Sequence, residues 1–164
     1  MKTLLTLLLL LLSLISFPSL SETVDDLVER DGLYYKKFSD VPFTGEINGE
    51  NEGRRVQGRL KNGTLEGPWV MYHEDGQLMF KGAYKNGKEE GSWVEYFDNG
   101  ELQRKGAYKS GKEEGSWVEY WSNGQLMFKG AYKSGMKEGS WVDYYRDGQL
   151  WTKGAYKNGK KEGP

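Results

Sequence analysis

The chain of 164 residues contains no cysteine, one histidine and four prolines. Without cysteine it cannot form a disulfide framework, a thiol nucleophile, a zinc ribbon or an iron–sulfur site. A single histidine excludes metal sites that are built from several histidines. With so few prolines, the chain is not collagen-like, because collagen combines abundant proline with glycine at every third position.

The chain also lacks an excess of charge of either sign. Its 23 Lys and Arg residues face 24 Asp and Glu residues, which gives a formal net charge of −1 at pH 7. Nucleic-acid binding requires clustered positive charge, and this balance provides no general basic field. We therefore expect no nucleic-acid partner.

Glycine and aromatic residues are abundant instead. The chain has 23 glycines, about twice the usual share of roughly 7%, and its aromatic content is 14%. Each glycine inside a helix costs about 1 kcal/mol relative to alanine, so a helical protein is disfavoured. Disordered chains contain few aromatics. The composition predicts a β-rich chain with glycines in turns and aromatics on the packing surface.

The first 21 residues have the pattern of a secretory signal. Lys2 gives a short positive start, and residues 4–17 are mostly leucine. This apolar run matches the hydrophobic region of a signal peptide and is shorter than the roughly 20 residues of a membrane-spanning helix. Small residues at Ser19 and Ser21 precede a predicted cut before Glu22. We expect residues 1–21 to be a cleaved signal peptide of an exported protein, periplasmic or secreted; the alternative is an uncleaved N-terminal membrane anchor.

A 24-residue repeat dominates the chain. Its glycines, tryptophans and tyrosines align in four full rows, 67–90, 91–114, 115–138 and 139–162. A fixed period of this length indicates stacked supersecondary units. A degenerate row at 45–66 lacks the tryptophan, and Gly163-Pro164 matches the start of another row. Residues 22–44 are predicted to be an N-terminal cap, with helical turns over 24–30 and a strand over 33–38.

Each row is predicted to form one β-hairpin. In the second row, residues 93–97 and 102–109 have the composition of strands. Asn99-Gly100 between them is a preferred pair for a two-residue type I′ turn, and residues 110–115 are then a polar loop to the next hairpin. One isolated hairpin is only marginally stable. The hairpins should therefore stack into an all-β fold, an elongated single-layer antiparallel ribbon.

The two-residue turn also predicts the register. Paired residue numbers in the second row sum to 199, so Trp93 lies opposite Gly106, where the missing side chain leaves room for the indole. Opposed residues share a face of the sheet. Phe97 is then expected on the face of Trp93, and Gln103 on the opposite face.

These residues resemble a known repeat family. The pattern G-S-W-V-E-Y-F-D-N-G-E-L-x-x-K-G-A-Y-K-x-G-K-x-E-G resembles the bacterial variant of the MORN (membrane occupation and recognition nexus) repeat over residues 43–163. Residues 32–36 and 42–45 are similar to the lead-in of that family. Many members are labelled as antitoxin components of toxin–antitoxin systems, which implies a protein-binding, neutralising role. The repeat family has no catalytic residues to carry over.

The sequence offers no pattern for catalysis, and we expect no enzyme, cofactor or metal site. His73 occupies a row position that is otherwise aromatic, which indicates a strand-end role. Gly87-Lys88 lacks the pattern of a phosphate-binding loop, and Asp98-Asn99 lacks the spacing of an EF-hand. The acidic residues that end each row lie beside lysines, as on a solvated edge; acid catalysis would need them buried in a cleft.

Three binding functions remain open. Repeat ribbons expose an extended surface on which large aromatics can bind a protein partner. The aromatic rows could instead bind cell-wall glycan, although glycan-binding repeats have adjacent aromatics in a shorter unit. The third alternative is a membrane surface, for which the balanced loop charges offer little attraction. An unpaired edge strand could also support self-association.

Less regular row positions are the candidate contact residues, because a repeat's framework must stay constant while its contact surface can vary. Two sets follow, and we favour the first, on the face of the tryptophans, as a groove; the second is expected on the opposite face. The first set is His73, Phe97, Trp121 and Tyr145, and the second is Met79, Gln103, Met127 and Trp151.

Overall fold

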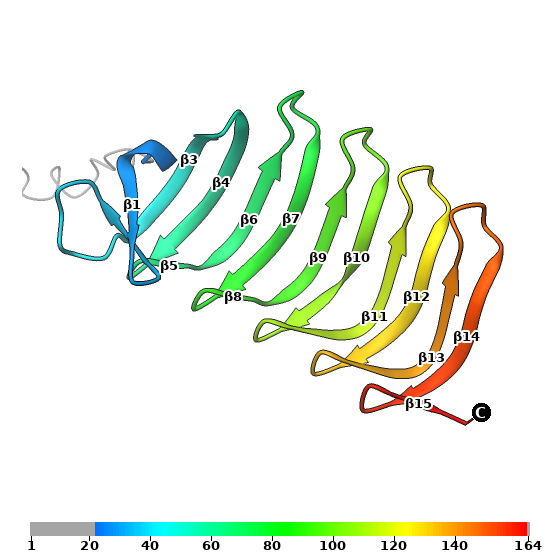
Figure 1. Cartoon of the computed structure of the whole chain (residues 1–164). Helices are drawn as coiled ribbons and strands as arrows, with labels where there is room; N and C mark the ends of the chain where they lie inside the picture. Colours follow the sequence, from blue (N-terminus) through cyan, green and yellow to red (C-terminus); the bar gives the residue numbers. More distant parts are fainter. Residues whose placement is uncertain (1–21, 164) are drawn as a thin grey trace, which may run out of the picture.

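The computed structural model describes residues 22–163, and the predicted signal peptide, 1–21, lies outside the described residues. Within them the chain forms one antiparallel sheet of 13 strands and a separate two-stranded hairpin at its N-terminal end (Figure 1). The strands of the large sheet follow one another in chain order, and the longer ones are arched along their length. The predicted all-β ribbon of stacked hairpins is confirmed.

The N-terminal cap is more extended than the sequence suggested. A 3-10 turn η2 (Val24–Asp26) is followed by strand β1 (Leu27–Arg30), which pairs with β2 (Leu33–Lys36). The prediction of helical turns beyond Asp26 was wrong. Asp31 and Gly32 both adopt positive φ, 53° and 76°, and close a tight turn that pairs the two flanking segments.

The cap covers the start of the large sheet. The degenerate row forms β3 (Gly45–Asn51) and β4 (Arg54–Lys61), joined by a two-residue turn. Val24, Leu27 and Tyr34 of the cap pack against the main hydrophobic cluster. The buried residues of that cluster are Phe43, Ile47, Val56, Leu60 and Trp69.

The four full rows continue the sheet. Each contributes one strand that carries the tryptophan and one returning strand; the short strand β5 ends the degenerate row, and β8 ends the first full row. The elements are β5 (Thr64–Leu65), β6 (Gly67–Tyr72), β7 (Leu78–Lys85), β8 (Lys88–Glu89), β9 (Gly91–Tyr96), β10 (Leu102–Lys109), β11 (Lys112–Tyr120), β12 (Leu126–Lys133), β13 (Met136–Tyr144), β14 (Leu150–Lys157) and β15 (Lys160–Glu162).

The type I′ turn was predicted at the wrong end of the hairpin. Within the loop that begins after Phe97, only Gly100 has a positive φ, of 79°. Phe97 N–H donates to the Glu101 carbonyl (2.9 Å), which leaves a three-residue loop. Such loops combine a type I turn with a bulge glycine. The side chain of Asn99 fixes this turn by accepting the Glu101 N–H at 3.0 Å.

The two-residue turns lie instead between successive rows. Ser110 and Gly111 both have positive φ, 51° and 79°, and Lys109 pairs with Lys112 across them. Residues 112–114, predicted to belong to a polar loop, are therefore part of β11. Each turn is also tied to the row before it. The Ser110 N–H donates to the carboxylate of Glu90 at 2.8 Å, and Asn86, Ser134 and Asn158 make the same bond with Glu66, Glu114 and Glu138.

The tryptophans pack between rows rather than within one hairpin. Trp93 does pair with Gly106 in the predicted register. However, its indole lies over Gly82 of the preceding row, where an added Cβ would overlap the ring. Trp117 covers Gly106 in the same way, and Trp141 covers Gly130. The indole therefore joins neighbouring hairpins, which corrects the prediction that it covers its own strand partner.

Tyrosines complete the packing of the indoles. Trp117 contacts Tyr108 and Tyr132 edge-on, with ring centroids 5.0 Å and 6.4 Å apart. Similar edge-on contacts run without interruption from Trp69 to Tyr156. Trp117 and Trp141 are each only 1% exposed. The single sheet thus buries the aligned tryptophans of the four rows without a second layer.

Candidate functional site

The two faces of the sheet carry different chemistry. We call the side with the tryptophans and tyrosines the Trp face. The opposite side is the Val–Lys face, because valines and lysines alternate across its strands in direct register. This line is Val70, Lys81, Val94, Lys105, Val118, Lys129, Val142 and Lys153.

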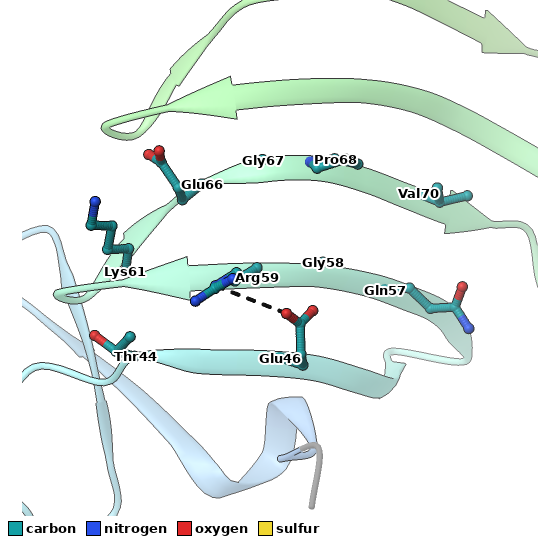
Figure 2. A pocket seen from close by; sticks show the side chains of 10 residues that line it. All are labelled: Thr44, Glu46, Gln57, Gly58, Arg59, Lys61, Glu66, Gly67, Pro68 and Val70. Carbon is teal, nitrogen blue, oxygen red and sulfur yellow. Dashed lines mark ion pairs between the residues drawn. The ribbon is translucent and has the colours of Figure 1, made fainter. Parts of the chain in front are cut away.

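Shallow hollows repeat along the Val–Lys face. Figure 2 shows the first, which spans β3, β4 and β6 and is lined by Gln57, Lys61, Glu66 and Val70 among others. Glu46 and Arg59 form an ion pair across it, with 3.9 Å between Arg59 Nε and Glu46 Oε1. A second hollow lies one row further on, around Lys81, Glu90 and Val94. These hollows are open, and they contain none of the predicted contact residues.

The two predicted sets of contact residues meet at one edge of the sheet. Each returning strand contains a bulge, because Glu95 pairs with Arg104 whereas Tyr96 pairs with Leu102. Gln103 is the extra residue of this bulge, and a bulge re-aims the side chains beside it. In the last row the rings of Tyr145 and Trp151, one from each set, lie 5.9 Å apart. The prediction that the sets lie on opposite faces was therefore wrong.

A hollow of about 580 Å³ marks this edge, which we call the turn edge. Its lining combines both predicted sets from two rows with Trp-face residues. The lining residues are Arg54, His73, Met79, Phe80, Trp93, Glu95, Tyr96, Phe97, Asp98 and Gln103. Four predicted contact residues are thus brought together, whereas Trp121, Met127, Tyr145 and Trp151 lie further along the same edge.

Residues of the first set also link successive rows. His73 Nε2 lies 3.1 Å from the backbone oxygen of Tyr96, and Trp121 Nε1 donates to the backbone oxygen of Tyr144 at 3.3 Å. These side chains are half-buried. In the last described row, Tyr145 and Trp151 are 51% and 63% exposed. The turn edge therefore ends in its most accessible aromatic pair.

A charged line crosses the Trp face. Arg104 pairs in register with Glu95 on one side and Glu119 on the other. Its Nη2 is 2.8 Å from Glu95 Oε1 and 3.1 Å from Tyr108 Oη. Burial alone would lower the pKa of Arg104, but its hydrogen bond to Glu95 and the charge of that carboxylate raise it. Burial raises the pKa of Glu119, and Arg104 opposes that rise.

Carboxylates also border the tyrosines of the Trp face. Glu89 pairs with Tyr84, and Glu113 pairs with Tyr108. Burial raises the pKa of Tyr84 to about 12, and the negative charge of Glu89 is the next largest cause of this rise. The row alignment could have revealed this acidic pattern if each strand position had been sorted by face. Arg54 of the degenerate row also lines the turn-edge hollow, and no repeated position in the sequence indicated it.

The repeated hairpins and the aromatic core define a β-repeat protein with an extended surface. The profile of the MORN repeat variant family matches residues 65–86, 89–110, 113–134 and 137–158. These segments make up more than half of the chain, which therefore belongs to the MORN repeat variant family. The four repeats indicate a scaffold for protein or membrane binding. A search of curated proteins finds no match to the chain. Among residues 22–163 there is no helix with the length and apolar character needed to cross a membrane.

Proposed function

We propose that the chain is an exported, non-enzymatic repeat scaffold that binds a protein partner along its turn edge. The observation that carries this proposal is the gathering of both variable sets of residues at that edge. The framework residues are constant from row to row, whereas the turn edge offers histidine, methionine, phenylalanine and glutamine around one hollow. Aromatic side chains in such settings commonly dominate the energy of protein interfaces.

Two finer parts of the proposal rest on the sequence. The leucine-rich leader, residues 4–17, supports export through a signal peptide. The resemblance to the bacterial repeat variant supports an antitoxin-like role, in which the scaffold neutralises the protein that it binds. His73, the single histidine, contacts a backbone oxygen of the next row, which is consistent with a structural part in a protein without catalysis.

A capture experiment with matched variants tests the protein-binding proposal. The immobilised chain should retain a protein partner, and Tyr145→Ala combined with Trp151→Ala should reduce the amount retained at least tenfold. Both side chains are more than half exposed, so their truncation should leave the fold intact. Lys105→Ala combined with Lys129→Ala, on the Val–Lys face, is the control and should retain the partner. Sedimentation with peptidoglycan but with no protein would support glycan binding instead.

A second candidate function is contact with an anionic membrane surface. The sequence charge is balanced, but the fold places Lys81, Lys105, Lys129 and Lys153 in one line on the Val–Lys face. Each lysine near an anionic surface contributes about 1 kcal/mol of attraction. This function would be favoured if the parent chain binds phosphatidylserine vesicles and the Lys105→Ala/Lys129→Ala variant does not.

A further inference from the structure

One row position on the Trp face changes its charge along the chain. Glu89 and Glu113 pair in register with Tyr84 and Tyr108. Lys137 and Lys161 occupy the same position opposite Tyr132 and Tyr156. The surroundings of this position are otherwise closely repeated. The Trp face is therefore acidic at this position in the earlier rows and basic in the later ones.

Lys137 shows what this position accommodates. Its Nζ lies 3.9 Å from the ring centroid of Trp141 and 5.2 Å from that of Tyr156. An ammonium group at such distances is attracted by the electron-rich faces of the rings. Here the chain itself supplies the cation that the aromatic pair binds.

The corresponding site around Trp93 is built in nearly the same way. Phe80 stacks on Trp93 with centroids 5.1 Å apart, as Phe128 stacks on Trp141 at 4.9 Å. Each indole N–H donates to a carboxylate two residues further on, Glu95 at 2.6 Å and Asp143 at 2.9 Å. Two positions differ: Glu89 stands where the later row has Lys137, and Arg104, opposite Glu95, stands where the later row has Thr152, opposite Asp143.

Further carboxylates make this part of the Trp face negative. Glu89, Glu95, Glu113 and Glu119 lie on it, with Arg104 as the cation among them. Arg104 is already paired with Glu95 at 2.8 Å. Burial raises the pKa of Tyr108; Arg104 opposes that rise, and Glu113, Glu95 and Glu89 add to it. The face is thus an aromatic surface whose charge complements that of a cationic segment.

We propose that the Trp face of residues 78–120 binds an extended, lysine- or arginine-rich segment of a partner protein. This inference rests on the proposed function and specifies the chemistry of the partner. Equivalent positions of successive rows are two strands apart, about 9.6 Å. A polyproline II segment repeats its side chains every three residues, about 9.3 Å. Cationic side chains at every third residue would therefore meet Glu89 and Glu113 in succession.

The direct test is binding of a labelled peptide, acetyl-(Lys-Pro-Pro)₄, to the purified chain by fluorescence anisotropy. We expect binding that weakens with salt and is absent for acetyl-(Glu-Pro-Pro)₄. Glu89→Lys should reduce the affinity about tenfold, a change of about 1.4 kcal/mol, because the new lysine should occupy the aromatic site as Lys137 does. Glu113→Gln should weaken binding without introducing a positive charge.

Matched variants separate this inference from a loss of folding and from the broader proposal. Glu89→Lys reproduces the arrangement already present at Lys137, so its melting temperature should match that of the parent chain. Lys105→Glu on the Val–Lys face should not weaken peptide binding. Equal binding by Glu89→Lys and the parent chain would overturn the inference. A protein partner retained equally by Glu89→Lys and Glu113→Gln, but lost with Tyr145→Ala/Trp151→Ala, would overturn it while leaving the proposed function intact.

Discussion

At the residue scale, the central feature is a tryptophan seated over a glycine of the row before it. The indole of Trp117 occupies the space that a side chain at Gly106 would fill, and tyrosines approach both of its sides. The sequence revealed that tryptophan and glycine belong together. It did not reveal which glycine is covered, because that depends on how the side chain leans across neighbouring strands.

Substitution of Gly106 by alanine should therefore destabilise the protein. A Cβ would overlap the Trp117 ring, and overpacking of this kind costs about 1–3 kcal/mol. Gly154→Ala is the matched control, because its Cβ would meet only the flexible end of Lys161. Urea unfolding followed by tryptophan fluorescence measures both. Equal loss of stability in the two variants would contradict the packing between rows.

Tyr84 should make the protein sensitive to alkaline pH. Burial and the charge of Glu89 raise its pKa from 10.0 to about 12 in the folded chain. The unfolded chain loses this proton at lower pH, so the contribution of Tyr84 to stability is complete below pH 10 and disappears as pH rises towards 12. The free energy of unfolding of Tyr84→Phe should fall less steeply over this range. If the free energy of unfolding of Tyr84→Phe fell with pH as steeply as that of the parent chain, the Tyr84 hydroxyl would not be the source of the alkaline sensitivity.

At the scale of the element, the hairpins were predictable but their turns were only partly so. The pairing of Glu95 with Arg104 follows the predicted register. The Asn99-Gly100 pair suggested a type I′ turn, but the Asn99 side chain bonds to the backbone two residues on and stabilises a three-residue loop. Ser110-Gly111, a less typical pair, forms the two-residue turn. The resulting bulge at Gln103 explains why the contact residues were assigned to the wrong faces.

The turns between rows should depend on the carboxylate that binds them. Glu114 accepts the backbone N–H of Ser134 at 2.7 Å, and this bond links one row to the next. Glu114→Ala should lower the free energy of unfolding by about 1 kcal/mol and accelerate hydrogen exchange of the Ser134 amide. Glu90→Ala should have the same effect at Ser110. An unchanged exchange rate at Ser134 would show that the carboxylate does not hold the turn.

At the scale of the whole molecule, the fold orders charges that the sequence mixes. The near-zero net charge resolves into a line of lysines on the Val–Lys face, whose hollows also hold Glu46, Glu66 and Glu90, and a line of carboxylates in the earlier rows of the Trp face. The composition could not predict this division, because it requires strand alternation and register together. The same alternation gives the two candidate functions different surfaces, which makes them separable by mutation.

Deletion of one whole row tests the independence of the repeats. Each row contacts mainly its neighbours, so stability should be close to a sum over rows and interfaces. Removal of residues 91–114 joins Glu90 to Gly115 and places Trp117 next to Gly82, which the deleted Trp93 normally covers. The variant should stay β-rich by circular dichroism, melt at a lower temperature and shorten by about 9.6 Å in small-angle scattering. Loss of cooperative melting would contradict the repeat account.

The most direct test of the proposed binding surface is covalent footprinting of the chain with and without its captured partner. Oxidation of Tyr145 and Trp151 reports on the turn edge, and acetylation of Lys105 and Lys129 reports on the Val–Lys face. We predict that the partner protects the two aromatic residues and leaves the two lysines as reactive as before. Protection of the lysines with unchanged oxidation of Tyr145 and Trp151 would contradict the account.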